Sequence, residues 1–266
     1  MKGRVLIAAG SDSGGGAGIQ ADTKTVTALG GYAATAITAL TAQDTLDVHG
    51  IEDVPPDFVY QQMKVVLADI GADAIKTGML HAIATLEAVA QAIHDHAPGI
   101  PLVVDPVMVA KGGAKLLQLD TVDFLTRNLV PLATLLTPNV PEAEFLTGLT
   151  IKSEKDMEMA GQALLELGPK MVLMKGGHLD GDGVVDLLVG ADGTMQFTSQ
   201  RIESRHTHGT GCTLASALAT GLAQGLPIRE NVIRAREYVR QGILQAPGYG
   251  KGHGPLNHGH TIGAMP

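Results

Sequence analysis

The stretch His208-Gly209-Thr210-Gly211-Cys212-Thr213 runs directly into the apolar, alanine-rich segment 214–222, and it predicts a glycine turn that opens a buried helix. Glycine permits backbone conformations closed to other residues, and the first amides of a helix have no partner within it, so such a turn can bind an anion. Cys212 lies on this turn, where a helix N-terminus tends to lower the pKa of a thiol and favour a thiolate that can accept a proton. The alternative is a helix start built from small residues around an inert, buried cysteine.

The length and composition predict a globular protein with one domain spanning residues 1–266. Apolar residues make up 45% of the chain and charged residues 17%, and the length suffices for a large core. A net charge of -8, no tryptophan and 3% aromatic residues disfavour nucleic acid as a partner. The single cysteine excludes an internal disulfide and suits a reducing compartment, so we expect a cytoplasmic protein.

Neither of two apolar stretches predicts a membrane segment. The run Val5–Ala9 is too short for the core of a signal peptide. Repeated threonines and the pair Gly30-Gly31 make the uncharged stretch 26–43 a poor membrane span. We therefore expect no membrane partner.

Short apolar runs alternate with helix-length segments, which predicts repeated βαβ units around a mostly parallel sheet with helices on both faces. The expected strands are Val5–Ala9, Ala34–Leu40, Ala74–Thr77, Leu102–Val104, Thr134–Leu136 and Met171–Met174. The expected helices are Ile19–Leu29, Asp57–Asp69, Ile83–His94, Leu116–Leu129, Glu154–Leu167, Thr213–Ala223 and Arg229–Gln245. The turn 190–194 between Val184–Val189 and Met195–Thr198 predicts an antiparallel hairpin at one edge.

In such a sheet, ligands bind beyond the carboxyl ends of the strands. The glycine loop Gly10–Gly16 follows the first expected strand there. The loop lacks the spacing of a dinucleotide fingerprint and the Gly-Lys-Ser/Thr of a Walker A loop, which disfavours a Rossmann dehydrogenase or a P-loop NTPase. It is either a flexible backbone that closes over a small substrate or a tight turn capped by serine or aspartate.

Five polar residues follow later strands, and each has a chemical and an ordinary structural interpretation. The amide of Gln43 can donate and accept, which matches the edge of an aminopyrimidine, or it is a surface glutamine. Asp105 suits Mg²⁺ held through water beside a triphosphate, although Asp-Pro also opens turns. Asn139 and Glu142 flank a proline at an expected helix start, where they either contact a ligand or cap the helix. Lys175 either reaches a phosphate as a point charge or extends outward from a strand end.

The chain has ten histidines but no HExxH motif or Cys–His spacing that would indicate a zinc site. Three of them, His253, His258 and His260, lie in a glycine- and histidine-rich tail that begins at Gly248. We expect this tail to be irregular, mobile and solvated.

Taken in order, these segments resemble the hydroxymethylpyrimidine/phosphomethylpyrimidine kinases of thiamine biosynthesis, within the ribokinase-like family. The resemblance covers nearly the whole chain, and an ordered series of motifs is more specific than any single one. The matching segments are Ala9–Asp22, Thr41–Gln43, Lys76–Leu80, Asp105–Met108, Thr137–Ala143, Met174–His178 and Thr207–Thr213.

The resemblance implies a three-layer α/β ribokinase-like fold, a homodimer, and two successive phosphorylations by ATP and Mg²⁺, first of the hydroxymethyl group and then of the monophosphate. It implies that the pyrimidine lies on Gln43, near Asp22, Met79 and Val107. It also implies that ATP and Mg²⁺ lie near Asp105, Asn139, Glu142, Lys175 and Thr210, with Asp105 and Glu142 holding the metal through water.

By the same resemblance, the catalytic set comprises Lys175, Gly209, Gly211 and Cys212, and Cys212 stands where many ribokinase-like enzymes carry an aspartate base. A pyridoxal kinase of the same family is one alternative, because its substrate also carries a hydroxymethyl group on a six-membered ring. A non-catalytic pyrimidine or nucleotide sensor is the other alternative. The presence of Cys212, Lys175, Asp105 and Glu142 together argues against a sensor.

Overall fold

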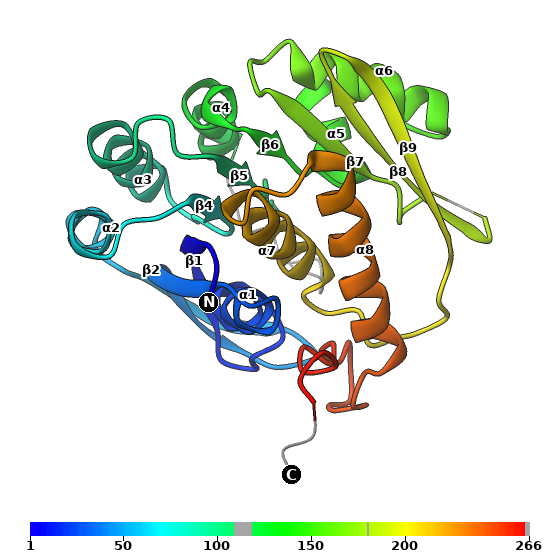
Figure 1. Cartoon of the computed structure of the whole chain (residues 1–266), viewed down its shortest axis with the longest axis horizontal. Coiled ribbons are helices and arrows are strands. Elements are labelled where there is room, and N and C mark those ends of the chain that lie inside the picture. The colour runs from blue at the N-terminus through cyan, green and yellow to red at the C-terminus, as the bar shows by residue number, and fades with distance from the viewer. Residues whose placement is uncertain (109–118, 180, 264–266) are drawn as a thin grey trace.

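The computed structural model describes residues 1–108, 119–179 and 181–263. Within this part of the chain, all nine strands belong to one sheet, in the order β3-β2-β1-β4-β5-β6-β7-β8-β9 (Figure 1). Strands β2, β1, β4, β5, β6 and β7 run parallel, and β3, β8 and β9 add antiparallel pairs at the two edges. The strands are β1 (Arg4–Asp12), β2 (Tyr32–Gln43), β3 (Val48–Asp53), β4 (Ala74–Thr77), β5 (Leu102–Val104), β6 (Leu135–Leu136), β7 (Met171–Lys175), β8 (Gly183–Gly190) and β9 (Gly193–Gln200).

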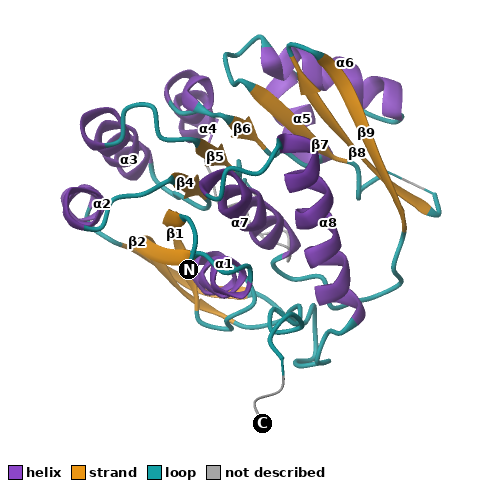
Figure 2. Cartoon of the chain, viewed as in Figure 1, coloured by secondary structure: helices purple, strands orange, loops and turns teal. Residues whose placement is uncertain are grey.

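Helices cover both faces of the sheet (Figure 2). The helices are α1 (Gly18–Ala28), α2 (Pro56–Asp69), α3 (Ile83–His96), α4 (Leu119–Asn128), α5 (Val140–Thr147), α6 (Glu154–Leu165), α7 (Thr210–Ala223) and α8 (Ile228–Leu244), with a short 3-10 helix at Val130–Leu132. One apolar core lies between the sheet and α1, α7 and α8, and a second lies between the sheet and α2 to α6. The expected three-layer α/β fold with an antiparallel hairpin is confirmed.

Strand β1 shows why the central strands read as continuous apolar runs. Val5, Ile7 and Ala9 pack in the core beneath α1, α7 and α8, while Leu6 and Ala8 pack in the core on the other side. Successive side chains of a strand point to opposite faces, so a strand that is buried on both faces has no polar alternation.

Strand β3 was not expected from the sequence, and it pairs antiparallel with β2 at the edge opposite the hairpin. Its residues are mostly polar and exposed, so no apolar alternation marks it. A turn joins it to β2, in which the carboxylate of Asp44 accepts the amide hydrogens of Leu46 at 2.7 Å and Asp47 at 3.0 Å. The hairpin of β8 and β9 is also tighter than expected, because Gly190 pairs with Gly193.

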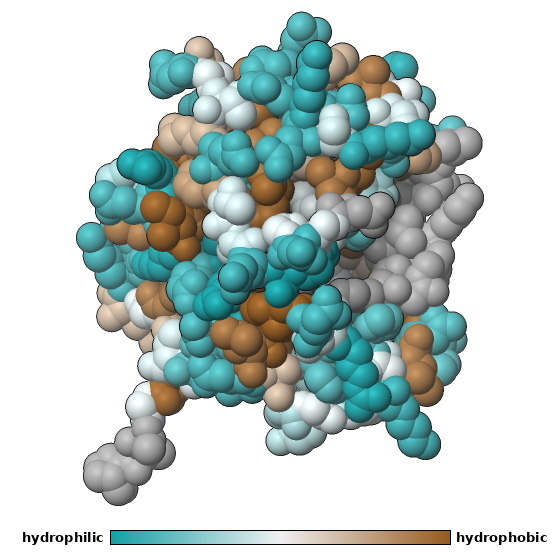
Figure 3. Space-filling view, turned by 90° about the vertical axis from the view of Figure 1, so that its right-hand side faces the viewer, coloured by the Kyte–Doolittle hydropathy of each residue, from teal (hydrophilic) through white to brown (hydrophobic). Residues whose placement is uncertain are grey.

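Of two further expectations, one lies partly outside the described residues and one is corrected. Helix α4 is described over Leu119–Asn128, and the expected helical residues 116–118 lie outside the described residues. The tail after α8 is irregular, but the expectation of a solvated tail is wrong for His258, whose residue surface is only 6% exposed. The face in Figure 3 is mainly hydrophilic, with scattered apolar residues. No described helix combines the length and the apolar character needed to cross a membrane.

The order of the strands places a crevice beyond the carboxyl ends of β1 and β4. The chain passes from β1 to β2 on one side, whereas β4 lies on the other side of β1 and is followed by β5 farther along. Ligands bind at such a point of reversal in open α/β sheets, because the connections diverge and leave space there.

Candidate functional site

A cavity of about 1280 Å³ lies at this crevice. It is lined by every site residue expected from the sequence except Asp22. The expected residues that line it are Gln43, Met79, Asp105, Val107, Asn139, Glu142, Lys175, Gly209, Thr210, Gly211 and Cys212. The glycine turn, the acidic residues and Lys175 therefore face one space, although they come from separate segments of the chain.

The glycine turn leaves the N-terminus of α7 uncapped at the cavity. Gly209 is the N-cap residue with φ 80°, and no side chain caps the helix. A Cβ at Gly209 would overlap the carbonyl oxygen of Gly16, so only glycine fits this approach between the two glycine loops. A Cβ at Gly211 would lie 3.5 Å from Lys175 Nζ and 3.7 Å from Asp105 Oδ2. The amides of the first turn therefore lie beside both charged groups, as an anion site requires. Among them, the amide of Thr210 donates to the carbonyl of Thr207 at 3.4 Å.

Lys175 and two carboxylates form a buried charge cluster at this end of the cavity. Its Nζ donates to Asp105 Oδ1 at 3.0 Å and lies 3.8 Å from Glu142 Oε2. Burial alone would lower the pKa of Lys175, but Asp105 and Glu142 raise it above its ordinary value. Lys175 is therefore a permanent cation at neutral pH.

Asn139 and Glu142 begin α5 with reciprocal hydrogen bonds. Asn139 Oδ1 accepts from the backbone amide of Glu142 at 2.9 Å, and Glu142 Oε2 accepts from the backbone amide of Asn139 at 2.7 Å. This is a capping box, so the structural interpretation of these residues is correct. Both residues also line the cavity, so capping does not remove them from the site.

The charge cluster fits a divalent cation. Burial raises the pKa of Glu142 to about 7, with Lys175 opposing this effect and Asp105 adding to it. Two carboxylates thus share one ammonium, and the cluster gains negative charge as Glu142 ionises. Mg²⁺ prefers one or two carboxylates together with water and phosphate oxygens. No cluster of three or more possible metal-ligating side chains occurs among residues 1–108, 119–179 and 181–263, so a cation here would take its other ligands from water and a ligand.

Cys212 corrects the expectation of a thiolate. Its side chain lines the cavity but is half-buried, and burial raises the pKa of its thiol to about 11. The charges of Asp22 and Asp105 raise the pKa of the thiol further. Lys76 and the amide of Gly18 lower it, but their effect is smaller than that of burial. At pH 7.5 the thiolate fraction is therefore below about one in a thousand.

Asp22 does not line the cavity but is paired with Lys76, which does, so the expectation that the pyrimidine lies near Asp22 stays a prediction. Asp22 is fully buried, and Lys76 Nζ donates to its two carboxylate oxygens at 2.9 and 3.0 Å. Ser216 Oγ donates to Asp22 Oδ1 at 2.6 Å. Lys76, which lines the cavity, was missed as a functional residue. A lysine inside the buried strand β4 was the available signal, because a buried charge needs a partner.

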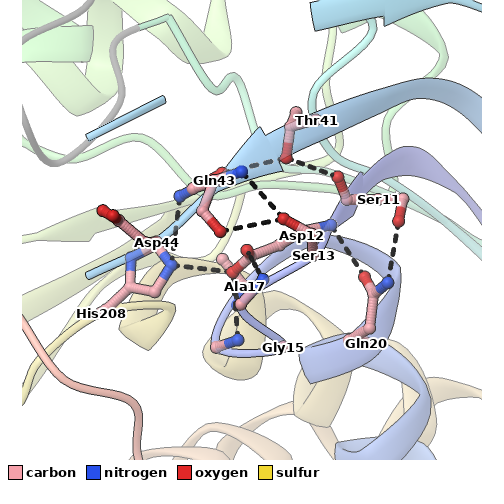
Figure 4. A network of polar contacts seen from close by, with 12 residues as sticks. Ser11, Asp12, Ser13, Gly15, Ala17, Gln20, Thr41, Gln43, Asp44 and His208 are labelled. Carbon is pink, nitrogen blue, oxygen red and sulfur yellow. Dashed lines mark hydrogen bonds and ion pairs between the residues drawn. The ribbon is translucent and has the colours of Figure 1, made fainter. Parts of the chain in front are cut away.

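A polar network joins the first glycine loop to the glycine turn (Figure 4). Asp12 Oδ2 lies 2.9 Å from His208 Nε2 and accepts from the backbone amides of Gly16 at 3.0 Å and Ala17 at 2.8 Å. Burial alone would raise the pKa of Asp12, but His208 and the amides of Ala17 and Gly14 hold it below its ordinary value. The loop is thus a turn organised by Asp12 that also lines the cavity.

The same network places the amide of Gln43 at the cavity. Its Nε2 lies 3.3 Å from His208 Nε2, and its Oε1 accepts from Thr41 Oγ1 at 3.3 Å (Figure 4). Asp12 and His208 were both missed as site residues, although each lies in a motif noted in the sequence. Their sequence separation of 196 residues hid their contact.

The fold and the site define a class: an α/β small-molecule kinase with a ribokinase-like fold, in which a helix N-terminus lies beside a lysine and two carboxylates. The profile of the family described as phosphomethylpyrimidine kinase matches residues 12–257. The chain therefore belongs to the phosphomethylpyrimidine kinase family, and the resemblance noted in the sequence is confirmed.

Individual relatives agree with this assignment. The chain is 52% identical over 257 residues, 97% of its length, to the thiamine biosynthesis bifunctional protein ThiED of Geobacter sulfurreducens. It spans about half, 52%, of the length of that relative. The crystal structure of phosphomethylpyrimidine kinase from Clostridium difficile matches with a TM-score of 0.81 and 42% identity, over 91% of this chain and 100% of that one.

A structure of pyridoxal kinase from Staphylococcus aureus in complex with AMP-PCP and pyridoxal is also similar. It matches with a TM-score of 0.90 and 34% identity, over 98% of this chain and 95% of that one. The fold therefore cannot by itself distinguish the two kinds of kinase, and the ring-binding residues have to do so.

Proposed function

We propose that the protein transfers the γ-phosphoryl group of ATP to 4-amino-5-hydroxymethyl-2-methylpyrimidine, and then transfers a second one to the resulting monophosphate. One observation carries this proposal: the uncapped N-terminus of α7 lies beside Lys175 and Asp105, and the amide of Gln43 faces the same cavity. A polyphosphate at the first place and an aminopyrimidine at the second would bring the phosphoryl donor and acceptor together.

Transfer of a phosphoryl group needs positioning and charge neutralisation more than covalent help, because its transition state is loose. Lys175 supplies a fixed positive charge, and the first amides of α7 supply hydrogen-bond donors that no helical carbonyl takes. Both are held before the substrate arrives: Lys175 by Asp105, and the turn by the close approach of Gly209 to Gly16. These groups favour the charge that develops on the transferred oxygens.

Mg²⁺ fits the acidic side of the same cluster. Asp105 and Glu142 would hold it, through water, and when bound it would neutralise phosphate oxygens of ATP. Asp105 is 2% exposed and Glu142 is 8% exposed, so a cation between them would replace much of the solvation that these carboxylates lack.

The acceptor end depends on Gln43 and Cys212. Gln43 would pair with the ring nitrogen and amino group of the pyrimidine, which would direct the hydroxymethyl group toward the glycine turn. The hydroxyl loses a proton during the reaction, and Cys212 would be the group that accepts this proton. The high pKa of the thiol makes Cys212 a strong but rarely ionised base, so its contribution would increase with pH.

Pyridoxal is a second candidate substrate, because a pyridoxal kinase has the same fold at a TM-score of 0.90. Turnover of hydroxymethylpyrimidine, its monophosphate and pyridoxal should be measured side by side with ATP and Mg²⁺. We expect both pyrimidines to be phosphorylated with a higher kcat/KM than pyridoxal. A higher kcat/KM for pyridoxal would reverse the assignment, and binding without consumption of ATP would indicate a sensor. A homodimer remains a prediction of the family resemblance, and a cytoplasmic location remains a prediction from the single cysteine.

A further inference from the structure

The irregular segment Gly252–His258, which we call the C-terminal brace, touches elements on both sides of the site. After α8 the chain turns back beneath α1 and α8 (Figure 1, orange to red). Its backbone is held against α8, where the amide of Asn257 donates to the carbonyl of Gly242 at 3.0 Å. Leu256, 3% exposed, packs against the same glycine. The brace is therefore fixed to a helix that lies outside the cavity.

The middle of the brace contacts the glycine turn. The amide of His208 donates to the carbonyl of Gly254 at 3.1 Å, and His208 forms an isolated parallel bridge with Pro255. A Cβ at Gly16 would lie 3.2 Å from Pro255 Cβ and closer still to the ring of His208. The brace thus packs on the outer side of the junction between the two glycine loops.

The end of the brace contacts the first turn of α7. Thr213 Oγ1 lies 3.0 Å from His258 Nε2, and the two residues are 0% and 6% exposed. The hydroxyl of Tyr238 donates to the carbonyl of His258 at 2.7 Å and fixes the backbone of the brace at this point. Thr213 directly follows Cys212 but does not line the cavity. Any effect of this contact on the reaction must therefore pass through the position of the turn.

The beginning of the brace contacts the other side of the site. The amides of His253 and Gly252 donate to Thr45, to its carbonyl at 2.8 Å and to its Oγ1 at 3.2 Å. A Cβ at Gly252 would overlap the carbonyl oxygen of Thr45, so the contact requires glycine. Thr45 lies shortly after Gln43, in the turn between β2 and β3. One short segment thus contacts both the turn that follows Gln43 and the turn that carries the first amides of α7.

We propose that the C-terminal brace positions the glycine turn for phosphoryl transfer, and that the hydrogen bond between Thr213 and His258 is its main point of attachment. This inference deepens the proposed function and rests on it. Thr213 and His258 are positioning residues, because neither lines the cavity. A displacement of the anion-binding amides by a fraction of an ångström would reduce transition-state stabilisation while leaving ring binding at Gln43 nearly intact.

The test compares two buried threonines of the same helix. Thr213→Val removes the hydroxyl that meets His258 but keeps the shape of the side chain, and Thr213→Ser keeps the hydroxyl. Thr220→Val is the matched control, since Thr220 is also 0% exposed and its Oγ1 donates to the carbonyl of Ser216 at 2.7 Å, away from the brace. All four proteins, including wild type, are assayed for kcat, KM and stability toward urea.

We expect Thr213→Val to lower kcat for hydroxymethylpyrimidine roughly 10- to 100-fold with little change in its KM. Thr213→Ser should restore most of kcat, and Thr220→Val should leave kcat unchanged at a similar loss of stability. If Thr220→Val lowers kcat as much as Thr213→Val does, or if Thr213→Val has wild-type kcat, the brace does not position the turn. If Thr213→Val fails to fold, His258→Phe tests the same contact by removing the other partner of the hydrogen bond while keeping a ring of similar size.

Amide hydrogen exchange separates this inference from the proposed function. In wild type without ligand, the amide of residue 213, which donates to the carbonyl of Gly209 at 2.9 Å, should exchange more slowly than in His258→Phe, and Thr220→Val should match wild type. This comparison needs no turnover. Absence of pyrimidine phosphorylation by wild type would therefore contradict the proposed function alone, whereas equal exchange in all variants would contradict the brace.

Discussion

Lys76 donates to both carboxylate oxygens of Asp22, at 2.9 and 3.0 Å, and both side chains are completely buried. Asp22 has Lys76 and Ser216 as partners, and Lys76 also lines the cavity. The pair therefore joins α1 and β4 at the floor of the site. Removing one partner would leave the other as an isolated charge without water.

Lys76→Met should lower the free energy of unfolding by about 3–5 kcal/mol, because it leaves the carboxylate of Asp22 buried without its counter-charge. Lys76→Met combined with Asp22→Asn should recover a large part of this loss. Urea unfolding of wild type, both single variants and the double variant measures the coupling. A loss below about 1 kcal/mol for Lys76→Met would mean that the two groups are not both charged in the folded protein.

Gln43→Leu should weaken binding of the aminopyrimidine by about 1–3 kcal/mol and weaken binding of pyridoxal less, because pyridoxal presents a phenolic oxygen where the pyrimidine presents an amino group. Titration calorimetry with both ligands measures the difference. Gln91→Leu, on the exposed side of α3, is the control and should bind both ligands as wild type does. Equal losses for the two ligands in Gln43→Leu would remove Gln43 from ring selection.

Lys175→Met should reduce kcat far more than it weakens pyrimidine binding, because its charge acts mainly as the γ-phosphoryl group moves. The variant also leaves Asp105 and Glu142 without a cation, so its stability should be checked by urea unfolding. Lys64→Met, at an exposed position of α2, is the control for a lost lysine charge. Wild-type turnover of Lys175→Met at saturating ATP would show that Lys175 has only a structural role.

Cys212→Ala should slow phosphorylation of the hydroxymethyl group more than that of the monophosphate, because only the alcohol has a proton to lose near neutral pH. With a thiol pKa of about 11, the thiolate fraction rises about tenfold per pH unit between pH 7 and 9. The ratio of wild-type to variant single-turnover rates should therefore increase with pH for the first step. Equal reductions at both steps, independent of pH, would mean that Cys212 acts through the geometry of the turn.

The stability of the protein should fall as the pH falls from 6.5 toward 4, through the titration of His258. Burial lowers the pKa of His258 to about 4, and Lys24 and His260 add to this effect. Between pH 6.5 and 4 the imidazole is therefore protonated in the unfolded chain but neutral in the folded protein. The free energy of unfolding is unaffected by this titration well above pH 6.5, and the titration lowers it by about 2 kcal/mol at pH 5. His258→Phe lacks this titration, so the difference between the two proteins in urea unfolding at pH 7 and pH 5 isolates it. Identical pH dependence in both would contradict the burial of a neutral imidazole.

The sequence was sufficient for the parts of the site that depend on local patterns. Gly209 and Gly211 precede an alanine-rich run, and Asp105 and Lys175 follow apolar runs, so local patterns alone place each of them at the carboxyl edge of the sheet. Strand β3 was missed because its polar residues carry no apolar alternation. The ionisation of Cys212 was also predicted wrongly, since a helix N-terminus lowers the pKa of a thiol but burial by distant elements raises it more.

Other features depended on contacts that no local pattern contains. The pairing of Asp12 with His208 spans 196 residues, and that of Lys76 with Asp22 spans 54. Apart from the lysine inside the buried strand β4, each residue is ordinary in its own segment, and only the packing of α1 and α7 on the same face of the sheet brings the partners together. The attachment of the tail through His258 has the same origin, since nothing in a glycine- and histidine-rich stretch indicates a buried anchor.

The long separation between Asp12 and His208 also governs when the catalytic centre can exist during protein synthesis. At about 5–20 residues per second, a ribosome needs roughly 10–40 s to add the 196 residues that separate the two partners. During that interval the Asp12 carboxylate has no imidazole partner. The contact between the two glycine loops can therefore form only after residues near 208 have left the ribosome, and the attachment of the brace through His258 follows later still.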